Sequence, residues 1–269
     1  MSRTPLLLAS IRSHKKLVEL LLRRDADPRS IDAKGLTAMH FICKGNCRSQ
    51  RELERAVECA TLLLEIGKEK NQSVQINARD RSGNTPLHYA LAYSDKRMIE
   101  LLLRNGADFN LANAEGLTAL HFMCKNFYKG GELVETLFKI SEESHRTVRV
   151  NARDIKGNTP LHLALQSRII DIAKTSELLL RNGADFNLAN AEGLTALHFM
   201  CKNCKIGHDL VDMIFRISEE NHQAVRVNAT DKLGNTPLYY AVAPIHSDCG
   251  IYWIRPIVQT LLKNDETRI

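Results

Sequence analysis

The stretch LLLRNGADFNLANAEGLTALHFMCKN, from Leu101 to Asn126, recurs without a change from Leu178 to Asn203. The two copies lie 77 positions apart, and chance does not produce an identity of 26 residues. A fixed period of a few tens of residues indicates stacked structural units instead of one closed core. We therefore expect one array in which each unit contacts its neighbours.

The repeated unit reads D-x-x-G-x-T-P-L-H-x-A, then an apolar helix ending in L-L-L, then N-G-A-D-F-N. Copies begin at Asp32, Asp80, Asn113, Asp154, Asn190 and Asp231, and the segment Thr4–Ala9 matches part of an earlier copy. The predicted units are about 1–31, 32–79, 80–112, 113–153, 154–189, 190–230 and 231–269. The glycine of the motif recurs after 48, 33, 41, 36 and 41 residues, so short and long units alternate.

This motif resembles the ankyrin repeat, over nearly the whole chain. The resemblance implies an all-α fold, a helical solenoid of about seven repeats with short β-hairpin projections, alternating short and long (inserted) units. It also implies protein–protein recognition without catalysis. We expect the core to contain Leu87, Ala90, Leu101, Leu102, Leu120, Leu161, Ala164, Leu178, Leu179 and Leu197.

The extra length of the long units is polar. It reads GKEKNQSVQ from Gly67, SEESHRTVR from Ser141 and SEENHQAVR from Ser218. We expect these residues to form an exposed loop at the end of the second helix of each long unit.

Composition limits the class of protein. The chain has 269 residues, of which 44% are hydrophobic and 25% charged, and no apolar run reaches the roughly 18–20 residues that span a bilayer. The net charge of +6 is spread without a dense basic run, which argues against a nucleic-acid binder. Seven unevenly spaced cysteines argue against a disulfide framework and favour the cytoplasm, with the nucleus as an alternative.

Histidines recur at one motif position, in His40, His88, His121, His162 and His198. One histidine per unit suits a stacking role better than a shared catalytic or metal site, and the resemblance implies a hydrogen bond from this histidine to the neighbouring unit. The cluster richest in potential ligands is His198, Cys201, Cys204 and His208, but cysteine at the second of these positions replaces a small packed alanine. We predict no catalytic residues, no metal and no cofactor.

The resemblance places the partner-binding residues on the hairpin tips and the exposed face of each first helix, along one concave side. These residues are Arg81, Ser82, Asn84, Tyr93, Glu115, Leu117, Lys125, Asn126, Ile155, Lys156, Asn158, Gln166, Ser167, Lys202, Asn203, Lys232, Leu233 and Asn235. Apolar and aromatic members of the set are candidate anchors. The pairs Lys125/Asn126 and Lys202/Asn203 suggest an extended acidic or repetitive partner.

Two asparagines of the A-D-F-N turns, Asn110 and Asn187, occupy positions that the resemblance links to asparaginyl hydroxylation. A hydrogen bond within the turn is the structural alternative.

Three functions remain open. The leading one is a monomeric scaffold or adaptor that binds another protein. The second is a regulatory ankyrin segment of a larger membrane protein or enzyme, and the third is a metal-dependent enzyme built on the histidine–cysteine cluster.

Overall fold

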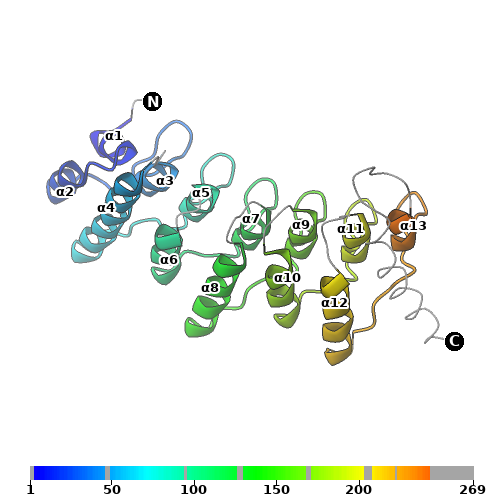
Figure 1. Cartoon of the computed structure of the whole chain (residues 1–269). Helices are drawn as coiled ribbons and strands as arrows, with labels where there is room; N and C mark the ends of the chain where they lie inside the picture. The colour runs from blue at the N-terminus through cyan, green and yellow to red at the C-terminus, as the bar shows by residue number, and fades with distance from the viewer. Residues whose placement is uncertain are drawn as a thin grey trace. The chain divides into compact units, whose positions relative to one another are not determined.

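The computed structural model describes residues 3–45, 49–93, 96–125, 130–167, 171–202, 208–221 and 223–242, with only the backbone described at Tyr93, His208 and Asp209. These residues form thirteen helices and no strand (Figure 1), which confirms the all-α class. The helices are α1 (Pro5–Ile11), α2 (Lys15–Arg23), α3 (Ala38–Lys44), α4 (Gln50–Glu69), α5 (Pro86–Tyr93), α6 (Lys96–Arg104), α7 (Ala119–Lys125), α8 (Gly130–Glu143), α9 (Pro160–Gln166), α10 (Ile172–Arg181), α11 (Ala196–Lys202), α12 (His208–Glu220) and α13 (Pro237–Val242). In the described ranges, no helix has both the length and the apolar character that crossing a membrane requires.

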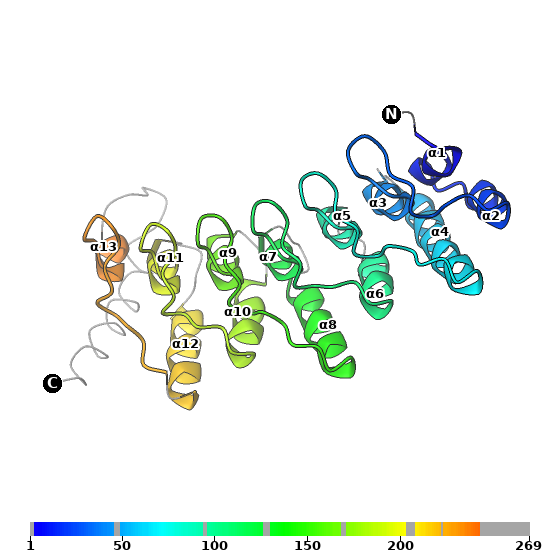
Figure 2. The ribbon, with the colours of Figure 1, turned by 180° about the vertical axis from the view of Figure 1, so that it is seen from behind.

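The chain divides into two units. Unit 1 comprises residues 1–122 and 136–148, and unit 2 comprises residues 123–135 and 149–269, so α7 and α8 are shared between them. In unit 1, the inner helices α1, α3 and α5 stack in one row and the outer helices α2, α4 and α6 stack in a second (Figures 1 and 2). In unit 2, α9, α11 and α13 form the inner row, and α10 packs against α12 in the outer row.

The helix ends follow from the sequence. Thr4 caps α1 by accepting a hydrogen bond from the backbone N–H of Leu7 at 3.4 Å, and Pro5 occupies the first helical position, where its missing N–H costs nothing. After α6 and α10 the chain turns at Gly106 and Gly183, with φ of +89° and +88°. Glycine adopts this left-handed conformation without a steric penalty, so the helices end there.

The core is largely the one that the repeat pattern predicts, with one shift of register. Leu102 and Leu179 are fully buried, but Leu101 and Leu178 are only half-buried. The third leucine of each L-L-L run is buried instead (Leu103 and Leu180). The reason is the period of the helix, because consecutive residues point about 100° apart and a run of three leucines cannot face the core at every position.

The prediction that these polar residues form an exposed loop after the outer helix is right for residues 70–75 and 144–149, which follow α4 and α8, and wrong for the first three residues of each segment. Residues 67–69, 141–143 and 218–220 form the last turn of α4, α8 and α12, and Ser141 and Ser218 are buried. An outer helix is followed by a residue in the left-handed conformation, for example Asn71 (φ +52°) after α4 and Gly106 after α6. These residues mark equivalent positions in the long and short units. From these residues to the next hairpin the long unit has two residues more than the short one, so most of the extra length precedes or begins the outer helix.

Candidate protein-binding face

Each hairpin before an inner helix is a tight turn built around an acidic or amide side chain. In the third repeat, Oδ1 of Asp80 accepts hydrogen bonds from the backbone N–H groups of Ser82 at 2.9 Å and Asn84 at 2.8 Å. Gly83 completes the turn at φ +72°. Asp154 and Asp231 accept the equivalent pairs of bonds, so the recurring aspartates form turns.

Backbone hydrogen bonds join successive hairpins within each unit. In unit 1, the N–H of Arg81 donates to the carbonyl of Lys34 at 3.0 Å, and the N–H of Ala114 donates to that of Ser82 at 2.9 Å. In unit 2, Ala191 donates to Lys156 at 2.9 Å, and Lys232 donates to Glu192 at 3.0 Å. The hairpin tips of each unit therefore form a connected ridge, visible as the row of loops beside the inner helices in Figure 2.

The motif histidines connect each repeat to the next, as the resemblance implies. In His162, Nδ1 accepts a hydrogen bond from the backbone N–H of Thr159 at 3.0 Å, so the ring proton lies on Nε2, which donates to the carbonyl of Leu194 at 3.1 Å. His40, His88 and His198 make the same bond to the carbonyls of Asn84, Leu117 and Asn235.

Burial favours the neutral form of these histidine rings. It lowers the pKa of His162 to about 4, and it also lowers the pKa of His40, His88 and His198 below the usual value. Protonation would add a hydrogen to Nδ1, where the threonine N–H already points. These histidines are therefore neutral structural ties at neutral pH.

Cysteines near the histidines behave as small apolar side chains. Cys43, Cys59, Cys124 and Cys201 are buried and free of disulfides. Burial raises the pKa of Cys59 and Cys201 to about 12 and that of Cys124 further. Among the described side chains, no three His, Cys, Asp or Glu residues gather as a metal site would require. Cys204 and the side chain of His208 lie outside the described residues, so the cluster at His198 stays a sequence-level alternative.

The predicted binding residues divide into three groups. Arg81, Ser82, Glu115, Lys125, Ile155, Lys156, Gln166, Lys202, Lys232 and Leu233 are exposed, and Asn84, Ser167 and Asn235 are half-buried. Asn126, Asn203 and the side chain of Tyr93 lie outside the described residues.

The expectation that Leu117 and Asn158 present free side chains is wrong. Both are only 6% exposed. They occupy the position after the hairpin glycine, where the chain returns to the helical body. There the carbonyl of Leu117 accepts the His88 bond, and the side-chain oxygen of Asn158 accepts a hydrogen bond from Asn190 at 2.8 Å. This position holds the stack together.

Five further hairpin residues are exposed and are absent from the predicted set: Ala33, Lys34, Ala114, Ala191 and Glu192. They occupy the motif positions that had already been selected in the other repeats, so the same pattern could have found them.

The two identical lysines of the duplicated stretch meet different neighbours. The ammonium of Lys202 lies 5.7 Å from the ring centroid of Tyr240, whose hydroxyl donates to Asp231 at 2.6 Å. Lys44 stacks in the same way on Tyr89 at 5.1 Å. At the position equivalent to Tyr240, the repeat that follows Lys125 carries Leu163, which offers no aromatic ring. Identity of sequence therefore does not make two identical binding patches.

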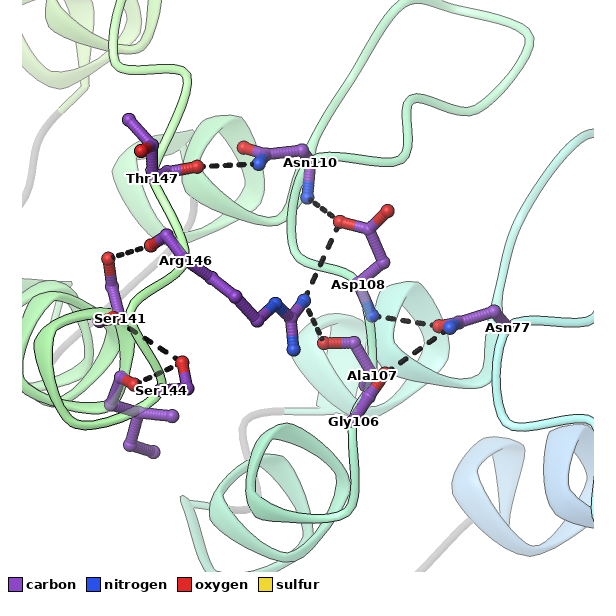
Figure 3. A network of polar contacts seen from close by, with 10 residues as sticks. Asn77, Gly106, Ala107, Asp108, Asn110, Ser141, Ser144, Arg146 and Thr147 are labelled. Carbon is purple, nitrogen blue, oxygen red and sulfur yellow. Dashed lines mark hydrogen bonds and ion pairs between the residues drawn. The ribbon is translucent and has the colours of Figure 1, made fainter.

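A second polar network lies at the end of the outer helices in unit 1 (Figure 3). The guanidinium of Arg146 donates to the carbonyl of Ala107 at 2.9 Å, lies 3.7 Å from a carboxylate oxygen of Asp108 and covers the ring of Phe109 at 4.5 Å. Asn77 in turn accepts a hydrogen bond from the N–H of Asp108 at 2.8 Å. The network connects the second, third and fourth repeats.

The asparagines linked to hydroxylation take part in this kind of network. The side-chain amide of Asn110 donates to the carbonyl of Thr147 at 2.8 Å, and that of Asn187 donates to the carbonyl of Ala224 at 2.9 Å. These bonds tie each turn to the following repeat and do not lie within the turn as expected, so both asparagines have a structural role between repeats.

Comparisons with known proteins agree with this architecture. A family model described as "Ankyrin repeats (3 copies)" matches residues 6–113, 92–175 and 174–267. Similar solved structures include the ankyrin repeat domain of Bcl-3, with a TM-score of 0.63 and 21% identity over 96% of this chain and 99% of that one. The ankyrin repeat domain of human ASB11 gives a TM-score of 0.64 and 19% identity, over 97% of this chain and 98% of that one.

Relatives by sequence include a Drosophila melanogaster transient receptor potential cation channel, subfamily A member 1, which is 29% identical over 89% of this chain. The B-cell lymphoma 3 protein homolog of Mus musculus is 29% identical over 72% of this chain, and the phosphocholine transferase AnkX of Legionella pneumophila is 26% identical over 72%. The matches cover 22%, 39% and 20% of these three relatives, respectively. The family model spans nearly the whole chain, and the solved structures share its fold. The chain therefore belongs to the ankyrin-repeat family.

Proposed function

We propose that the chain is a non-catalytic scaffold or adaptor that binds another protein through its hairpin tips and inner helices. One observation carries the proposal. The hairpins are fixed by backbone and aspartate hydrogen bonds, while the side chains at their tips, such as Arg81, Ile155 and Lys232, are exposed. Within each unit, exposed side chains on fixed hairpins are suited to recognition, because little conformational entropy is lost on binding.

Further parts of the proposal concern the setting. We place the chain in the cytoplasm or the nucleus, as a monomer, without a nucleic-acid partner and without a metal or cofactor. Buried free thiols support a reducing compartment. The nucleic-acid part has a simple check: the protein should elute from a heparin column below physiological salt, and retention above it would contradict the proposal.

The binding face is tested by co-precipitation from cell extract with paired variants. Ile155→Asp with Leu233→Asp alters two exposed tips, and the matched control Arg216→Glu alters an exposed side chain of outer helix α12. Captured partners should be lost with the hairpin variant and retained with the control. Loss with Arg216→Glu alone would move the binding face to the outer helices.

The second candidate function is a regulatory ankyrin segment of a larger membrane protein or enzyme. The observation that favours it is the length of the relatives, since the match covers only 22% of a cation channel and 20% of a phosphocholine transferase. Sequencing of the full transcript discriminates between the two candidates, because a longer reading frame with a channel or transferase domain would support the second.

A further inference from the structure

The hairpin ridge of unit 2 has a definite order of side chains. Its six tip residues are Ile155, Lys156, Ala191, Glu192, Lys232 and Leu233. The carbonyl of Lys156 accepts from Ala191, and the carbonyl of Glu192 accepts from Lys232, so the second tip residue of each hairpin faces the first tip residue of the next. The ridge therefore reads, in space, apolar–basic–small–acidic–basic–apolar.

The two apolar ends of this ridge are unusually exposed. Ile155 is 69% and Leu233 is 83% exposed, the highest values among the large hydrophobic side chains that the structure describes. Such exposure contributes little to folding stability, since burial and not presence stabilises an apolar side chain. The corresponding tips of unit 1 carry no large apolar side chain; they are Ala33, Lys34, Arg81, Ser82, Ala114 and Glu115.

Both lysines lie inside the apolar ends. Lys156 and Lys232 are exposed, and their ammonium groups form no ion pair within the described ranges. The carboxylate of Glu192 lies between them on the middle hairpin, at an exposed position. A ligand that lies along the ridge would therefore meet positive, negative and positive charge in turn.

The length of the ridge follows from the contact between hairpins. Backbones joined by hydrogen bonds lie about 4.8 Å apart, and each hairpin contributes two arms, so the hairpin pitch is about 10 Å. The close approach of Gly193 to Asp231, where an added Cβ would lie 2.9 Å from the Cα, agrees with this packing. Ile155 and Leu233 are the first and last of six positions along the ridge, so five steps of about 4.8 Å, about 24 Å in all, separate them. An extended peptide covers this length in about seven residues at roughly 3.3 Å each.

We propose that this ridge binds an extended peptide segment of a partner protein, with apolar side chains about seven positions apart, acidic residues just inside them and a basic residue near the centre. The inference rests on the proposed function and specifies the ligand chemistry of that face. Each apolar end of the peptide contacts Ile155 or Leu233, each acidic residue pairs with Lys156 or Lys232, and the central base pairs with Glu192.

The test uses a fluorescein-labelled peptide, Leu-Asp-Ser-Ser-Lys-Ser-Asp-Leu, and fluorescence anisotropy with the full chain. We expect saturable binding, weakened at least tenfold by Ile155→Asp with Leu233→Asp. Lys156→Glu with Lys232→Glu should weaken it about fivefold, and a peptide with lysine in place of both aspartates and aspartate in place of the central lysine should restore binding to that variant. The matched control is Lys139→Glu with Arg216→Glu, at exposed side chains of outer helices α8 and α12, which should leave the affinity unchanged.

Absence of binding, or an affinity that the unit 2 variants do not change, would overturn the inference. A peptide with the two leucines only three positions apart serves as a spacing control, and equal affinity for it would also overturn the inference. All the substituted side chains are exposed, so unchanged circular dichroism should accompany each variant. The proposed function stands or falls separately, by the partner capture described above: a captured partner that depends on the hairpin face, together with failure of the peptide, refutes the peptide chemistry alone.

Discussion

Acidification should destabilise the fold through its histidine ties before the turn-forming Asp80 and Asp231, whose pKa is lowered, are protonated. The pKa of His162 is about 4 in the folded chain and 6.5 in the unfolded chain. A histidine whose folded pKa is lowered contributes stability that is complete above pH 6.5 and is lost as the pH falls toward 4. At pH 5 the unfolded ring is almost fully protonated and the folded ring is not, so His162 alone removes roughly 2 kcal/mol between pH 7.5 and pH 5.

The measurement is urea unfolding followed by circular dichroism at pH 7.5 and pH 5. In this range the aspartates whose pKa is lowered from 3.8, such as Asp80 and Asp231, do not titrate in either state, so they do not contribute. His162→Gln removes the titrating ring, and the loss of stability on acidification should be smaller by roughly 2 kcal/mol than in the unaltered chain. His14→Gln, at an exposed histidine, is the matched control and should keep the full loss. An equal loss in the chain with and without His162 would refute the reasoning.

Three further predictions concern stability, each measured by urea unfolding. Arg146→Gln introduces the residue found at the equivalent position of another long unit, Gln223. It should lower the free energy of unfolding by about 1–2 kcal/mol, because it removes the bond to Ala107 and the contact with Phe109. No loss would mean that the network does not contribute to stability. Thr175→Met with Ser176→Ile should raise the free energy of unfolding by about 1–3 kcal/mol. Both hydroxyls are buried without a hydrogen-bond partner in the described residues, and the equivalent positions of α6 are apolar. A loss of stability would indicate overpacking. Gly157→Ala should lower the free energy of unfolding by about 1–3 kcal/mol more than Gly183→Ala does. Both glycines have positive φ, but only at Gly157 would an added Cβ lie 2.8 Å from the backbone nitrogen of Ala191. Equal losses would contradict this packing.

Most of the fold could be predicted from the repeat motif. Helix starts at Thr-Pro, helix ends at glycine and the histidine ties all follow from local chemistry that one unit contains. The predictions that were wrong concern burial by the neighbouring repeat or the face of a helix on which a residue lies. Leu117 and Asn158 looked like hairpin residues, but their burial comes from the repeat that packs beside them. Leu101 is the first of three consecutive leucines, and which of them point into the core depends on how the helix packs against its neighbours.

The candidate site was harder to predict because exposure is a property of the assembled stack. Ile155 and Leu233 were recognisable as apolar residues at tip positions, yet their place at the two ends of one ridge became clear only from the bonds between hairpins. Lys125 and Lys202 show the converse, since identical sequence gave different surroundings. The aromatic ring below Lys202 belongs to the next repeat and not to the duplicated stretch.

Recognition through the hairpin face is tested most directly by site-specific photo-crosslinking. A photoreactive amino acid is placed in turn at Leu233, on a hairpin tip, and at Arg216, on outer helix α12, and each protein is irradiated in cell extract. If recognition uses the hairpin face, Leu233 should yield a discrete crosslinked partner that Arg216 does not yield, and Ile155→Asp should abolish the crosslink. A partner that crosslinks from Arg216 and not from Leu233 would contradict the account.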